Sequence, residues 1–249
     1  MFSKLHSFVA PFFRSENFAR GAALQERADL FRLFLLAKAN ETWPKVTVTT
    51  LEQIRELAPT LKDQRNAVLE HVQRRSLTHF ERWYEERPPP LDPLDPEKPL
   101  SEERRAEVEA EYAAQVYEAQ KRAFGFALRV GPSKAGPKSG RGVFVDGKVA
   151  PGSVIAFYPG VWYEPVHLFE IRGGTKHFEG NDYLMARFDK VIIDGSQKAV
   201  ALVPPDAVAN PLSVANLVNH PPEGRQPNVV PAALNIDTQI APELVGLLG

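Results

Sequence analysis

The chain has 249 residues, 43% of them hydrophobic and 24% charged, which is typical of a globular protein with a sizeable core. Its 30 Lys and Arg almost balance its 31 Asp and Glu, so direct nucleic-acid binding, which needs a surplus of cations, is not expected. Cysteine is absent, which excludes disulfides and thiolate metal sites, and the scattered histidines predict no metal site. No apolar run approaches the roughly 20 residues that span a bilayer, so no membrane span is expected.

The first 87 residues are predicted to form a helical N-terminal region. Residues 1–15 combine basic and apolar residues without an acid, which fits either a mitochondrial presequence or an apolar segment docked on the protein. No secretory signal peptide is evident, so we expect an intracellular protein of the nucleus or cytoplasm, with the mitochondrion as the alternative.

Two long helices are predicted in this region. The first runs from Ser15 to the Trp43-Pro44 step, because the residue before a proline avoids helical geometry. The second runs from about Leu61 to Glu86. Apolar residues at helical spacing predict the buried face of each: Leu24, Ala28, Phe31 and Leu35 in the first, and Val68, Val72, Leu77 and Phe80 in the second.

A proline-rich linker follows at residues 88–100. Six of the twelve residues from 88 to 99 are proline, which is typical of a stiff, extended segment. A third helix, at residues 101–125, leads into the remainder of the chain. Ser101 is its predicted N-cap, and Ala and Glu predominate behind it.

After Gly125 the sequence pattern changes to short apolar runs interrupted by Gly and Pro. RGVFVDG (141–147), SVIAFYPG (153–160) and KVIIDGS (190–196) are each predicted to be a strand closed by a turn. Helices followed by strands give an α+β fold class.

Three segments of this β-rich half carry candidate functional residues. The first is Gly140-Arg141-Gly142-Val143-Phe144, followed by Tyr158-Pro159-Gly160. The second runs from Tyr183 to Ile193-Asp194-Gly195. The third is Asn216-Leu217-Val218-Asn219-His220, followed by Pro227-Asn228. Singly each is a weak signal, since a Gly-x-Gly is most often a turn.

In this order the three segments resemble the SET domain, the β-clip fold of S-adenosylmethionine-dependent protein lysine methyltransferases. The resemblance covers roughly residues 126–245 and implies a SET-like domain at 126–249. It implies that Gly140, Arg141, Gly142, Asn219 and His220 bind S-adenosylmethionine. It also implies that Tyr183 is catalytic, lining a lysine channel, and that the partner is a protein substrate bearing a lysine. A cross-strand packing role for Tyr183 is the alternative.

The sequence also departs from the family pattern. Asn216-Leu217 replaces the family's Arg-Phe, and no cysteine follows His220, so the family's zinc site is not expected. Residues 242–249 end without the Glu-Glu-Leu…Tyr segment that carries the family's principal catalytic tyrosine. We therefore expect an incomplete SET domain with impaired methyltransferase activity. The alternative is a catalytically inactive SET-like scaffold that binds proteins.

Overall fold

The computed structural model describes residues 16–45, 53, 56–57, 60–90, 101–136, 139–171, 178–186, 191–200, 210–222 and 224–234. The predicted N-terminal presequence or docked segment (1–15) and most of the proline-rich linker (91–100) lie outside these ranges. The described part of the chain combines helices with small antiparallel sheets, which confirms the α+β class. Within it, no helix is both long and apolar enough to cross a membrane.

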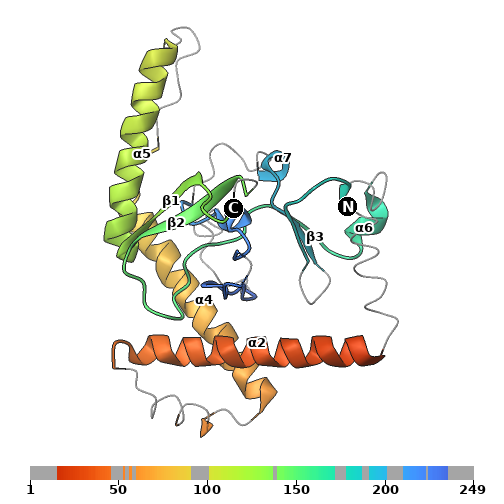
Figure 1. Cartoon of the computed structure of the whole chain (residues 1–249). Coiled ribbons are helices and arrows are strands. Elements are labelled where there is room, and N and C mark those ends of the chain that lie inside the picture. Colours follow the sequence, from red (N-terminus) through yellow and green to blue (C-terminus); the bar gives the residue numbers. More distant parts are fainter. Residues whose placement is uncertain are drawn as a thin grey trace.

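Three long helices make up the predicted helical part. They are α2 (Glu16–Thr42), α4 (Leu61–Glu86) and α5 (Glu102–Phe124). The first two cross each other, and α5 projects from the body of the molecule (Figure 1). All three follow the predicted ranges closely, because capping residues and prolines determine where these helices begin and end.

Capping hydrogen bonds mark the ends of α4 and α5. Thr60 accepts a 3.1 Å hydrogen bond from the backbone N–H of Asp63 at the start of α4. The predicted N-cap Ser101 does the same for Arg104 at 3.2 Å. Gly125 ends α5 in the left-handed conformation, with φ of 80°.

The buried face predicted for the first helix is wrong in its N-terminal half. Leu24 is 65% exposed and Ala28 is also exposed. Among its described side chains, α2 buries Phe34, Ala37, Ala39 and Asn40, all in its C-terminal half. Phe34 packs on Val68 and Val72 of α4. On α4 itself the predicted positions Val68, Val72 and Phe80 are buried as expected.

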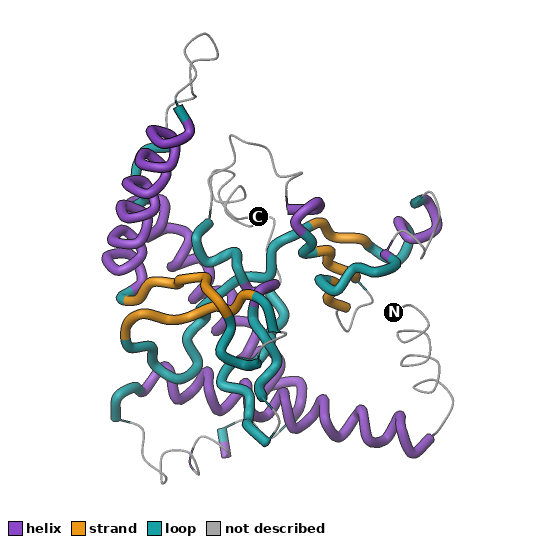
Figure 2. The backbone as a smooth tube through the Cα atoms, turned by 45° about the horizontal axis from the view of Figure 1, so that its top comes forward, coloured by secondary structure: helices purple, strands orange, loops and turns teal. Residues whose placement is uncertain are grey.

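Two separate sheets follow. Strands β1 (Phe126–Pro132) and β2 (Arg141–Gly147) form an antiparallel hairpin in which Phe126 pairs with Gly147 and Pro132 with Arg141. Strands β3 (Val161–Tyr163), β4 (Leu184–Ala186) and β5 (Ile192–Asp194) form an antiparallel sheet of order β3-β5-β4. Figure 2 shows the hairpin and the small sheet as separate units. Three short elements complete the description: α6 (His167–Glu170), α7 (Gln197–Val200) and the 3₁₀ helix η2 (Ala215–Leu217).

The strand predictions succeed in part. Residues 141–147 form β2, and the 190–196 segment contains β5. The prediction of a strand at residues 153–160 is wrong, because this segment does not join a sheet. It is held by a loop instead: Phe157 N–H donates to Leu212 O at 2.8 Å, and Phe157 O accepts from Ala215 N at 3.0 Å. The apolar run is explained by burial of Phe157 in the core.

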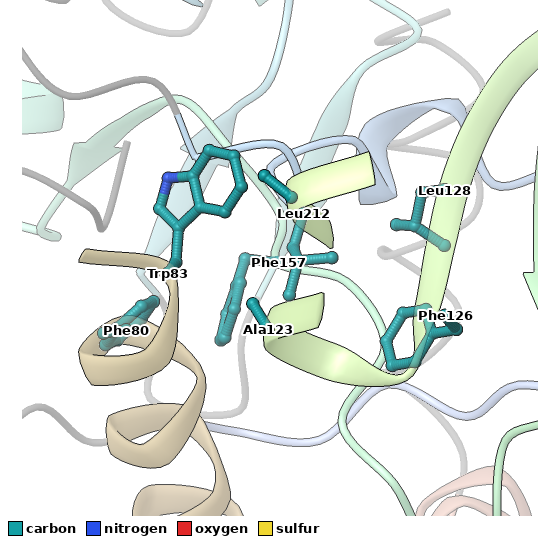
Figure 3. Packing of buried hydrophobic residues seen from close by; sticks show 8 residues of the cluster. Phe80, Trp83, Ala123, Phe126, Leu128, Phe157 and Leu212 are labelled. Carbon is teal, nitrogen blue, oxygen red and sulfur yellow. The ribbon is translucent and has the colours of Figure 1, made fainter. Parts of the chain in front are cut away.

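The main hydrophobic core joins the helices to the β-rich half. Trp83 and Phe80 of α4 pack with Ala123 of α5, and Phe157 lies 4.9 Å from Phe80 between ring centroids. Figure 3 shows Leu212 and the β1 residues Phe126 and Leu128 in the same cluster. Residues on both sides of the proline-rich segment therefore share one core.

Polar contacts anchor the loop after β2 to the helices. Asn40 of α2 donates to Pro151 O at 3.0 Å. His71 and His79 of α4 place their Nε2 atoms 2.9 Å from Gly152 O and Val154 O, respectively. Because backbone carbonyls accept only, both Nε2 atoms are the protonated ones. The helical layer thus fixes the loop that leads into the core residue Phe157.

Candidate functional site

The predicted Gly140–Gly142 motif lies where the hairpin loop enters β2. Gly140 has φ of +60°, and its carbonyl accepts a 2.8 Å hydrogen bond from Ser133 N. Gly142 is buried, and a Cβ built on it would lie 3.2 Å from Asn219 Nδ2 and 3.4 Å from Ser133 Cα. The first glycine therefore serves a left-handed turn, and the second permits close approach of another segment.

That other segment carries the predicted Asn219 and His220. Asn219 Nδ2 donates to the carbonyl oxygen of Arg141 at 2.7 Å and to Ser133 Oγ at 3.0 Å. The structure therefore places Asn219 against the Gly-x-Gly turn. His220 is exposed beside it, and its side chain makes no hydrogen bond with another described residue.

Tyr183 lies on a different part of the β-rich half, just before β4. Tyr183 is 42% exposed, and both the catalytic role and the cross-strand packing role stay predictions. Its backbone is held at three points: its N–H donates to Asn181 Oδ1 at 2.9 Å, and its carbonyl accepts from Gly195 N at 2.8 Å and from the Tyr158 hydroxyl at 2.9 Å. A rigid backbone thus carries an exposed phenol.

Gly195 and Asn216 connect this region to the third motif. Asn216 Nδ2 donates to Gly195 O at 2.7 Å. A Cβ on Gly195 would lie 2.8 Å from Tyr158 Cε1 and 3.0 Å from Asn216 Cβ, so only glycine fits where these segments cross. A continuous series of contacts therefore runs from Tyr183 through Gly195 and Asn216 to the segment that bears Asn219.

Asp194 and Tyr158 stabilise this crossing. Asp194 is buried, and its Oδ1 accepts hydrogen bonds from Asn181 Nδ2 at 2.7 Å and from Ser196 N at 2.9 Å. Burial, followed by the nearby carboxylate of Asp194, raises the pKa of Tyr158 to about 12. Tyr158 therefore remains protonated as a donor to Tyr183 O at physiological pH.

Sequence reasoning missed the roles of Ser133, Asn181 and Asp194, and it treated Asn216 only as a departure from the family pattern. Asn216 lies in η2 and Asn219 lies beyond its extended C-cap Val218, so no shared helical turn predicted their roles. Both amides hold backbone carbonyls of other segments.

The junction leaves several groups free for a ligand. A Cβ on Gly140 would meet nothing within 4 Å among the described atoms, so the backbone there is open to close approach. Asn219 Oδ1 accepts no hydrogen bond from a described residue, and the Arg141 side chain is exposed and in no salt bridge with a described carboxylate. A free acceptor and a free cation are the types of group that the ammonium and the carboxylate of an α-amino acid need.

No metal site was found in the part of the chain that the structure describes, where no three His, Cys, Asp or Glu residues gather. Comparison with protein-family models, with curated proteins and with solved structures found no match.

Proposed function

We propose that this chain binds S-adenosylmethionine where the Gly140–Gly142 turn meets Asn219 and His220, as the cofactor site of a SET-type protein lysine methyltransferase. The observation that carries the proposal is the 2.7 Å hydrogen bond from Asn219 Nδ2 to Arg141 O. It joins two motifs, 78 positions apart, that the family resemblance assigns to the same cofactor.

The free groups at the junction fit the amino-acid end of this cofactor. Asn219 Oδ1 would accept from the cofactor ammonium, and Arg141 would pair with its carboxylate. The open space at Gly140 would let backbone groups approach the remainder of the molecule. When bound, the cofactor supplies the methyl group on a positively charged sulfur and also the leaving group.

The contribution of the protein to such a transfer is alignment. The lysine amine must be neutral to attack, and desolvation lowers the pKa of a lysine. The Tyr183 hydroxyl makes no hydrogen bond with a described residue, so it can accept one from the amine N–H and leave the nitrogen lone pair for attack. Tyr158 and Asn181 act as positioning residues, because they hold the backbone of Tyr183.

A non-catalytic scaffold is the second candidate. It is favoured by α5, whose residues 102–107 are all exposed and which projects from the body of the molecule (Figure 1). A projecting, charged helix is a surface that a protein partner can contact. Under this proposal the chain folds without binding the cofactor.

Calorimetric titration with S-adenosylhomocysteine separates the two candidates. We expect saturable binding to the wild-type chain and at least about tenfold weaker binding to Asn219→Ala, which loses two hydrogen bonds at the turn. The matched control is Asn66→Ala, an exposed asparagine on α4, which should bind as the wild type does. A folded wild-type chain that does not bind would refute the methyltransferase proposal and leave the scaffold.

A further inference from the structure

A pocket lies away from the proposed cofactor site, between the helices and the loop after β2. It has a volume of about 270 Å³. Its walls come from the C-terminal ends of α2 and α5, from α4 and from residues 148–154. None of the residues assigned above to cofactor binding or catalysis lines it.

The polar lining of this pocket is cationic. Arg75, His79 and Arg82 occupy positions i, i+4 and i+7 of α4, which is one face of a helix, and Lys148 faces them from the loop. None of the described lining residues is acidic. Burial lowers the pKa of His79, and the Arg82 and Arg75 cations lower it further against the opposing effect of its bond to Val154 O. Two arginines and a lysine therefore carry the charge.

The carboxylates near the pocket form salt bridges with other cations. Glu41 pairs with Arg74 at 3.1 Å and with Lys38 at 3.0 Å, and Glu86 pairs with Arg122 at 2.8 Å. No salt bridge joins Arg75, Arg82 or Lys148 to a carboxylate of the described residues. In addition, Arg75 Nε is buried without a hydrogen-bond partner in the described part of the chain. A buried donor without a partner and clustered like charges are costly unless an anion joins them.

We propose that this pocket binds a small phosphate monoester. Its phosphate would lie on Arg75, Arg82 and Lys148, since arginine offers several donors in a geometry that matches phosphate oxygens. Its organic part would lie on Trp43 and Phe124, which also line the pocket. Trp43 is 52% exposed, and an exposed indole beside cations suits a flat or apolar group. The modest volume excludes a large ligand.

Phenyl phosphate is the probe, because it joins a ring to a phosphate without the adenosine that the proposed cofactor site would recognise. Calorimetry on the full chain should show saturable binding of phenyl phosphate, weaker binding of inorganic phosphate and none of phenol. Arg75→Ala and Lys148→Ala should each weaken phenyl phosphate binding by about tenfold or more. Arg74→Ala removes a neighbouring arginine that already has a carboxylate partner, and it should change the affinity less than twofold.

Several results would overturn the proposal. One is no saturable binding at millimolar concentration by a chain whose circular dichroism is native. Another is equal weakening by Arg74→Ala and Lys148→Ala, which would indicate only a general effect of surface charge. Displacement of phenyl phosphate by S-adenosylhomocysteine would assign the binding to the other site. Since Lys148 is exposed and outside the core, its variant tests the pocket even where Arg75→Ala unfolds.

Discussion

Asn219 donates a hydrogen bond of 2.7 Å to the backbone carbonyl of Arg141, and the same Nδ2 lies 3.2 Å from the position that a Cβ of Gly142 would occupy. One amide thus fixes the Gly-x-Gly turn and makes a side chain at Gly142 unfavourable. The two segments therefore depend on each other. Gly142 leaves room for Asn219, and Asn219 holds the strand β2 that follows Gly140.

Replacing Asn219 with Asp tests this hydrogen bond independently of any ligand. A carboxylate has the same shape but cannot donate to Arg141 O or to Ser133 Oγ as the amide does. We expect Asn219→Asp to lower the free energy of unfolding by about 1 kcal/mol in urea denaturation. Asn66→Asp on the exposed face of α4 should change it by less than about 0.5 kcal/mol. Equal effects of the two variants would refute a structural role for the Asn219 amide.

Gly152 tests the docking of the loop on the helices. It has φ of +78°, and a Cβ there would lie 2.0 Å from Leu36 O of α2, which is backbone and cannot move aside. Gly152→Ala should cost more than about 3 kcal/mol, because backbone strain and overpacking add. Gly125 has φ of +80° with nothing within 4 Å, so Gly125→Ala should cost only the strain, about 1 kcal/mol. Thermal unfolding monitored by circular dichroism compares the stability of the two variants. Equal losses of stability would contradict the docking of the Gly152 loop on α2.

Stability should fall as the pH is lowered below 6.5, the ordinary pKa of histidine. Burial lowers the pKa of His71 and of His79 in the folded chain, so the unfolded state takes up protons first. The loss begins near 6.5, continues down to the folded pKa values and amounts to at most about 1.4 kcal/mol per pH unit for each histidine.

Glutamine variants assign this pH dependence. Glutamine cannot titrate but keeps an N–H donor, so His71→Gln and His79→Gln should each flatten the dependence of the melting temperature on pH between 8 and 5. Exposed His220 is the control, and His220→Gln should leave the slope as it is in the wild type. A wild-type melting temperature that does not change over this range would show that neither histidine is held neutral by the fold.

The hydroxyl of Tyr158 is expected to stabilise the segment that bears Tyr183. Tyr158→Phe removes the 2.9 Å hydrogen bond to Tyr183 O and leaves that carbonyl short of one donor. We expect a loss of about 1 kcal/mol in the free energy of unfolding. Tyr84→Phe is a suitable control, because Tyr84 is 42% exposed and contacts Arg87 through its ring. Indistinguishable urea midpoints for the two variants would contradict the positioning role of Tyr158.

The sequence predicted the helices well and the β-rich half less well. Ser101, Gly125 and the Trp43-Pro44 step are local signals, so the long helices could be placed from neighbours in the chain alone. The buried face of α2 could not be predicted in this way. Leu24 and Phe34 are both apolar, and tertiary contact with α4 decides which of them is buried. Residues 153–160 had the composition of a strand, but the backbone of Phe157 bonds to Leu212 and Ala215, which are distant in the sequence and belong to no strand.

The candidate site was likewise predictable only in part. The family resemblance implied that Gly140, Gly142 and Asn219 belong to one site, and in the structure these three residues lie together. Ser133 and Asn181 were not predictable, because a lone serine or asparagine in a loop carries no signal until its partner across the fold is known. Tyr183 remains a prediction as a catalytic residue; what is observed is an exposed ring on a fixed backbone.

Hydrogen exchange of the full chain, with and without S-adenosylhomocysteine, tests the central claim most directly. We predict slower exchange in two separate peptides, one covering the Gly140–Gly142 turn and one covering Asn216–His220, and no change in α2. Binding with protection at both segments would support a single cofactor site built from the two motifs. Unchanged exchange at both segments under saturating ligand would contradict it.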